Sequence, residues 1–168
     1  MSSPAAVETR ISVGIGQLAV SRDPGVILVA YGLGSCIGVS AYDPGSGVVG
    51  MVHVLLPDSE GRVPEKGEPA RYADTAIPSL VQAMSGLGAN VSRLVLKLAG
   101  GASVLGQANA QKFKIGERNA EAIKEQLRSN SLRCCAETLG GTKGRTLELH
   151  AATGKTYVRT AASPAVEL

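Results

Sequence analysis

The centre of the fold is set by three consecutive segments: Cys36-Ile37-Gly38-Val39-Ser40-Ala41-Tyr42, then Asp43-Pro44-Gly45-Ser46-Gly47, then Val48-Val49-Gly50-Met51-Val52-His53-Val54-Leu55-Leu56. The first and third segments have the apolar patterns of β-strands, and the second is a dense cluster of turn residues. The sequence therefore predicts a β-hairpin over residues 36–56.

The expected register of this hairpin brings Cys36 and His53 together. If the strands pair symmetrically about a turn centred between Pro44 and Gly45, Cys36 lies directly across from His53. Side chains opposite each other on an antiparallel pair have Cβ atoms roughly 4.5 to 5.5 Å apart and share a face. A slip of one residue would turn one of them to the other face.

A cysteine paired with a histidine can carry out acyl transfer. A free thiol has a pKa of about 8.5, and a neighbouring imidazolium lowers it. The histidine can then protonate a leaving amine and activate a water. Backbone N–H groups around Gly34, Ser35 and Cys36 are candidate donors to the oxyanion, because glycine allows close approach of the backbone. The alternative is structural, since free cysteines are often buried as small hydrophobes.

Composition indicates one globular domain. The chain has 168 residues, of which 44% are hydrophobic and 18% charged, a size that permits a well-buried core. The net charge is +3, and the basic residues are scattered without an aromatic platform. Nucleic-acid binding is therefore not expected.

The N-terminus has neither a basic region nor an apolar region typical of a signal peptide, and no apolar run is long enough to span a membrane. We expect a cytoplasmic protein that does not insert into the membrane. The three cysteines are an odd number, so a disulfide framework is not predicted. Cys134 and Cys135 are adjacent in an expected strand, where they face opposite sides, so they are not expected to share a metal ion and are interpreted as structural.

Periodicity indicates an α/β chain of the α+β type. Helices are expected over residues 72–88 and 117–129, and strands precede, separate and follow them. Residues 1–9 are predicted to be a disordered tail, residues 10–160 a single catalytic domain, and residues 161–168 a mobile tail.

Between Ile11 and Arg159 the sequence resembles the CheD family of chemoreceptor glutamine deamidases. The resemblance is carried, in order, by Val13 to Gly16, Asp23 to Ile27, Gly32 to Cys36, Asp43-Pro44, His53 to Ser59, Tyr72 to Ala76, Leu98 to Ala102, and Ile115 to Asn119.

This resemblance implies a layered sandwich of mixed, mostly antiparallel β-sheets flanked by helices, similar to the cysteine hydrolase fold of cytotoxic necrotizing factors. It implies that Cys36 attacks the carboxamide of receptor glutamines through a thioester, that His53 is the general acid and base, and that no cofactor is needed. The implied partners are the cytoplasmic helices of methyl-accepting chemotaxis receptors, and the phosphatase CheC.

One position departs from the family pattern. A threonine stands six residues before the cysteine in the family as a third catalytic member, and here that position is Ala30. An alanine side chain cannot orient an imidazole, so a backbone carbonyl or a hydroxyl such as Ser35 or Ser40 would have to substitute. If neither does, an alternative function is a weakly catalytic or non-catalytic module that binds receptors or CheC.

Overall fold

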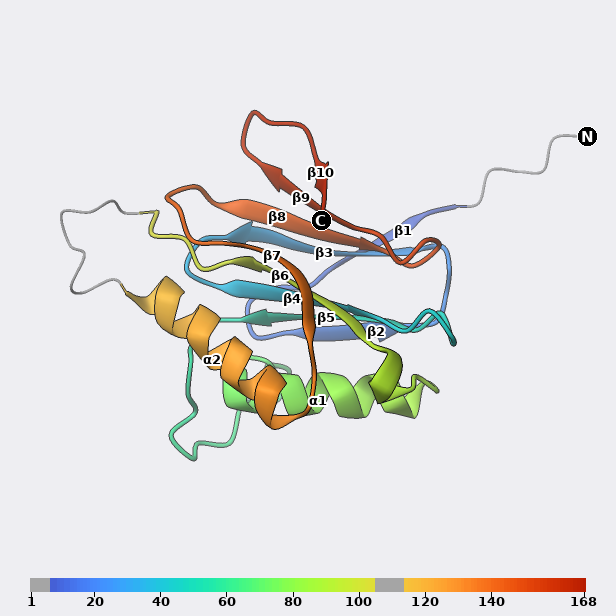
Figure 1. Ribbon diagram of the computed structural model, residues 1–168, viewed down its shortest axis with the longest axis horizontal. Helices are drawn as coiled ribbons and strands as arrows, with labels where there is room; N and C mark the ends of the chain where they lie inside the picture. Colours follow the sequence, from blue (N-terminus) through green and yellow to red (C-terminus); the bar gives the residue numbers. More distant parts are fainter. Residues whose placement is uncertain (1–6, 105–113) are drawn as a thin grey trace, which may run out of the picture.

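Two five-stranded mixed sheets and two helices form three layers in the computed structural model, which describes residues 7–104 and 114–168. Sheet A is the outer layer, sheet B is the middle layer, and both helices lie on the far side of sheet B (Figure 1). The α+β class and the layered, mostly antiparallel architecture with flanking helices are as predicted, and both helices cover the same face of sheet B.

Sheet A has the strand order β1-β3-β8-β9-β10. Its only parallel pair within the described residues is β1 with β3, and the other pairs are antiparallel. The strands are β1 (Thr9–Ser12), β3 (Val26–Leu33), β8 (Arg145–His150), β9 (Thr156–Thr160) and β10 (Val166–Glu167).

Sheet B has the strand order β2-β5-β4-β6-β7, with the predicted hairpin of β4 and β5 at its centre. The pair β6 and β7 is parallel, because α2 connects these two strands. The strands are β2 (Leu18–Ser21), β4 (Ile37–Tyr42), β5 (Val49–Val54), β6 (Val95–Gly100) and β7 (Cys134–Leu139).

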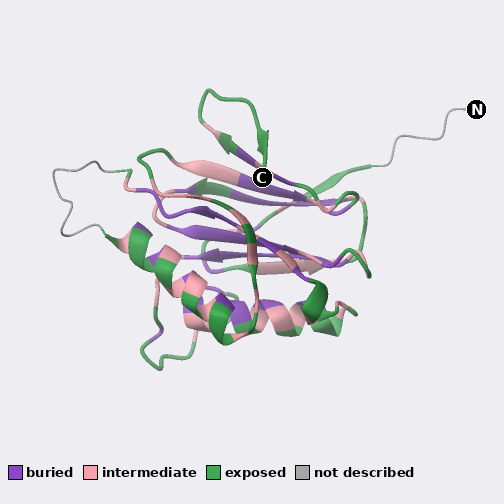
Figure 2. Cartoon of the chain, viewed as in Figure 1, coloured by how far each residue is buried: buried purple, intermediate pink, exposed green. Residues whose placement is uncertain are grey.

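Alternation along β4 divides the core into two layers. On one face, Ile37, Val39 and Ala41 pack with the helices α1 (Ala73–Gly86) and α2 (Ile115–Ser129). A short 3-10 helix, η1 (Val91–Arg93), follows α1. The opposite face of the hairpin meets sheet A, where Ser40 and Thr156 join the sheets through a buried hydroxyl pair 3.0 Å apart. The central strands are accordingly buried, whereas the helices show an exposed outer side (Figure 2).

The two ends of the chain differ from the expected tails. β1 begins at Thr9, inside the predicted N-terminal tail, and residues 1–6 of that tail lie outside the described residues. At the other end, residues 161–168 return to sheet A, where β10 pairs antiparallel with β9 and Leu168 donates its N–H to Thr156. The predicted mobile C-terminal tail is therefore corrected to a short paired strand.

Neither α1 nor α2 is long and apolar enough to cross a membrane.

Candidate active site

The hairpin register places His53 across from Gly38 instead of Cys36. The predicted direct pairing is wrong by two residues, because the loop closes between Asp43 and Val48 and its centre lies one residue later than expected. A shift of two residues preserves the face of every side chain. Cys36 and His53 consequently remain on the same side of sheet B, as diagonal neighbours facing sheet A.

Cys36 lies at a tight corner between β3 and β4, with 7% of its surface exposed. The two residues that follow β6 hold this corner, since Gly101 donates its N–H to the Cys36 carbonyl at 2.9 Å and Ala102 donates its N–H to the Gly34 carbonyl at 2.8 Å. Gly100 has a φ of +117°, and a Cβ there would overlap the Cys36 carbonyl oxygen. Glycine at this position is thus required for the close approach of the two chains.

His53 is buried in β5 and oriented by the main chain. Its Nδ1 lies 2.9 Å from the carbonyl oxygen of Val13. Because a carbonyl oxygen only accepts, Nδ1 carries the proton, and Nε2 of the neutral ring has a free lone pair. Nε2 is buried and makes no hydrogen bond within the described part of the chain. The imidazole is therefore held in the tautomer of a general base.

The electrostatics favour a neutral pair in the free protein. Burial raises the pKa of the Cys36 thiol above its ordinary value. Burial also lowers the pKa of His53, an effect that the bond to Val13 opposes in part. The lowered thiol pKa expected from sequence is thus not found, because desolvation disfavours both charged forms.

Ala30 lies in β3, fully buried in the apolar layer between the sheets. It offers no polar atom to the imidazole from its side chain. The bond from His53 instead goes to Val13, whose own N–H donates to the Val29 carbonyl beside Ala30 at 2.7 Å. Of the substitutes considered for the missing hydroxyl, the structure supplies the backbone carbonyl.

Asn119 is a further residue of this region that sequence reasoning did not single out. It is fully buried on α2, and its Nδ2 donates to the carbonyls of Ser35 and Leu55, both at 2.9 Å. The available signal was an asparagine on the buried helix stripe, in line with Ile123 and Leu127. A polar residue at such a position needs partners, because an unpaired buried amide is costly.

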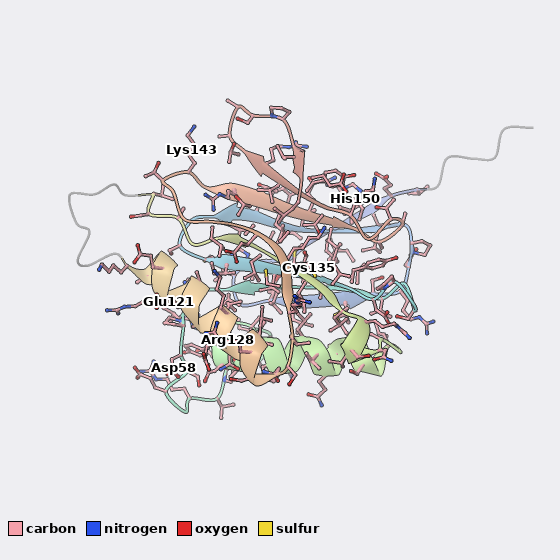
Figure 3. The ribbon with its side chains drawn as sticks, in the orientation of Figure 1. Asp58, Glu121, Arg128, Cys135, Lys143 and His150 are labelled. Atoms are coloured by element: carbon pink, nitrogen blue, oxygen red, sulfur yellow. The ribbon has the colours of Figure 1, made fainter. Side chains whose placement is uncertain are left out.

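The remaining thiols and the second histidine lie away from Cys36. Figure 3 shows Cys135 on β7 and His150 on β8, in different sheets. The ring of His150 packs edge-on against Tyr157 and lies 3.3 Å from the Glu148 carboxylate. Within residues 7–104 and 114–168, no three His, Cys, Asp or Glu side chains are grouped as a metal site.

Known proteins resemble this chain over most of its length. A family model described as CheD chemotactic sensory transduction matches residues 55–160, a range that begins just after His53. A probable chemoreceptor glutamine deamidase CheD of Symbiobacterium thermophilum is 45% identical over 89% of this chain and 91% of that protein. The chemoreceptor glutamine deamidase CheD of Thermotoga maritima is 44% identical over 88% of this chain and 89% of that protein.

A solved structure also aligns with the fold. The Bacillus licheniformis hypothetical protein YfiH superimposes with a TM-score of 0.46 at 12% identity, over 75% of this chain and 51% of that chain.

Proposed function

Because this chain belongs to the CheD family, we propose that it deamidates glutamine side chains of chemoreceptors, with Cys36 as nucleophile and His53 as general base and acid. The observation that carries the two roles is the hydrogen bond from His53 Nδ1 to the Val13 carbonyl, which leaves Nε2 free on the face shared with Cys36. The proposed substrate group is a glutamine side chain on a cytoplasmic helix of a chemoreceptor.

The first half-reaction forms a thioester. The Sγ–H proton passes to His53 Nε2 as Sγ bonds to the carboxamide carbon, and the carbonyl oxygen becomes an oxyanion. When the tetrahedral intermediate collapses, the C–N bond breaks, and the nitrogen takes the proton from Nε2 and leaves as ammonia. The transient imidazolium is formed only while the substrate excludes water, so the neutral resting pair is compatible with this sequence.

The second half-reaction releases glutamate. A water gives a proton to Nε2 and attacks the thioester carbon, after which the C–S bond breaks and Sγ recovers the proton. The N–H groups of Ser35 and Cys36 are the proposed donors to the oxyanion in both steps, because they belong to the residue before the nucleophile and to the nucleophile itself.

A non-catalytic module is the less favoured function. This alternative was based on the alanine at position 30. The Val13 carbonyl orients the His53 ring, which the side chain of Ala30 cannot do. Binding of CheC is compatible with either function and forms a further part of the proposal, on the family resemblance alone.

The test is deamidation of a chemoreceptor cytoplasmic fragment, followed by mass spectrometry of its peptides and by ammonia release. We expect wild-type protein to convert defined glutamines to glutamates, and Cys36→Ala and His53→Ala to lose this conversion. Cys135→Ala is the matched control, because Cys135 is an exposed free thiol on β7. Equal conversion by wild type and Cys36→Ala would refute the assignment of the nucleophile.

A further inference from the structure

Asn119 connects the two halves of the candidate site. One hydrogen of its Nδ2 goes to the carbonyl of Ser35, which precedes the proposed nucleophile, and the other goes to the carbonyl of Leu55, two residues after His53. The close packing of Gly116 on the backbone of Gly101 brings α2 to this position. A single side chain thus ties the corner of Cys36 to the end of β5.

The orientation of this amide is fixed by its partners. Both Ser35 and Leu55 offer carbonyl oxygens, which only accept, so Nδ2 and not Oδ1 must face them. Oδ1 points away from them, and it is buried with no partner in the part of the chain that the structure describes. Burying an unpaired amide oxygen costs free energy. The two hydrogen bonds that Nδ2 donates must therefore offset the free-energy cost of the unpaired Oδ1.

The geometry of the peptide unit shows what the bond to Ser35 controls. A trans peptide is planar, so its N–H points opposite to its C=O. With the Ser35 carbonyl held toward α2, the N–H of Cys36 must point away from α2. Ala102 holds the preceding peptide in the same way, because it donates to the Gly34 carbonyl and so fixes the direction of the Ser35 N–H.

We propose that Asn119 is a positioning residue that aims the Cys36 N–H at the oxyanion of the tetrahedral intermediate. The inference rests on the proposed function of Cys36. The N–H of a nucleophilic residue is well placed for this task, since it lies one bond from the Cα that carries the attacking side chain. Without the Asn119 amide, the Ser35–Cys36 peptide has no side-chain bond among the described residues to hold its direction.

The test separates oxyanion stabilisation from thiol reactivity in Asn119→Leu. Alkylation of Cys36 by iodoacetamide is a displacement at saturated carbon and creates no oxyanion, whereas deamidation does. Removing one oxyanion donor costs about 10²- to 10³-fold in kcat, and a misdirected donor should cost about 10- to 100-fold. We expect that loss in deamidation of the receptor fragment, with an unchanged pH profile of Cys36 alkylation.

Asn130→Leu is the matched control. Asn130 ends the same helix, and its Nδ2 donates only to the Gln126 carbonyl, at 2.7 Å. It should lower the melting temperature without changing kcat. If Asn119→Leu does not fold, Asn119→Ser replaces it, because the single hydroxyl hydrogen of serine cannot donate to both the Ser35 and the Leu55 carbonyls. The same separation of kcat from alkylation is expected for this variant.

Two results would overturn the proposal: an Asn119 variant with wild-type kcat, or one in which alkylation and deamidation fall together. Failure of the proposed function has a different signature, because it is read from wild type and Cys36→Ala alone. A wild-type protein that releases no ammonia from the receptor fragment, or a Cys36→Ala variant that does, would reject the enzyme assignment whatever Asn119 does.

Discussion

The ring Nδ1 of His53 donates to the carbonyl oxygen of Val13 across 2.9 Å. This bond joins the end of β1 to the centre of sheet B and fixes which ring nitrogen is free. In cysteine and serine hydrolases a third group orients the base. Here the main chain of Val13 holds the ring of His53, the proposed base. A side chain at position 30 is therefore not required for the orientation of His53.

The pH dependence of deamidation should report the buried state of His53. Only the neutral imidazole can accept the thiol proton, and burial lowers the pKa of His53 below its usual value of about 6.5. We expect kcat/KM for the receptor fragment to fall with decreasing pH through a midpoint below about 6.5. A midpoint above that value would mean that His53 is stabilised as an imidazolium.

The pKa of the Cys36 thiol should be shifted upward, whereas that of His53 is shifted downward. Because burial raises the pKa of Cys36, its alkylation by iodoacetamide should rise with pH through a midpoint above about 8.5 in the free protein. Peptide mapping would distinguish Cys36 from Cys134 and Cys135, and Cys36→Ala provides the blank. A midpoint near 7 would instead indicate a preformed pair of thiolate and imidazolium.

Restoring the family hydroxyl should bring little gain. Ala30→Thr adds two heavy atoms, a methyl carbon and a hydroxyl oxygen, in a fully buried position, at an expected cost of about 1–3 kcal/mol. Since Nδ1 of His53 already has a partner, kcat should not increase. Thermal melting and deamidation kinetics check the two parts, and a large increase in kcat would show that the Val13 carbonyl is an inadequate substitute.

The close contact of Gly100 with the Cys36 corner predicts a strong effect of a single methyl group. Gly100→Ala should destabilise the fold by about 2 kcal/mol or more, because the added Cβ overlaps the Cys36 carbonyl and φ is positive. Gly86→Ala is the control, since a Cβ there meets nothing within 4 Å and alanine favours the helix. Equal melting temperatures for the two variants would contradict the contact.

Asp43 should make the stability sensitive to acid. Its buried carboxylate accepts five hydrogen bonds, from Gly45, Ser46 and Asn90 and twice from Arg93, and the guanidinium of Arg93 first of all lowers its pKa. A group with a lowered folded-state pKa stabilises the fold above its unfolded pKa of about 3.9, and the contribution is lost as pH falls below that value.

Melting temperatures measured from pH 7 downward test this point. Wild type should lose stability as the pH falls below about 4, and Asp43→Asn should start lower at pH 7 and show a smaller decrease. Parallel curves for the two proteins would show that another group dominates the acid sensitivity.

The sequence could predict the faces of the hairpin but not its register. Alternation assigns Ile37 and Val39 to one side and Cys36 and His53 to the other, and this holds for any even shift. The exact pairing depends on the hydrogen bonds that Asp43 makes inside the loop, which a turn composition does not specify. The direct pairing of Cys36 and His53 was wrong for this reason.

Main-chain contributions were the least predictable part of the site. Every residue type has the same main-chain carbonyl, so the sequence does not mark the one at Val13. Its role follows only from the pairing of β1 with β3. Asn119, in contrast, lay on an apolar helix stripe and could have been recognised as a buried amide in need of partners. The pairing of β10 was missed because a strand of two residues leaves almost no pattern.

The central claim, that Cys36 forms a thioester with the substrate glutamine, can be tested by acid quenching during turnover of a receptor fragment, followed by peptide mapping of the enzyme. We expect an acyl adduct on the peptide that contains Cys36, seen in wild type and absent from Cys36→Ala. An adduct on any other residue, or undiminished ammonia release by Cys36→Ala, would contradict it.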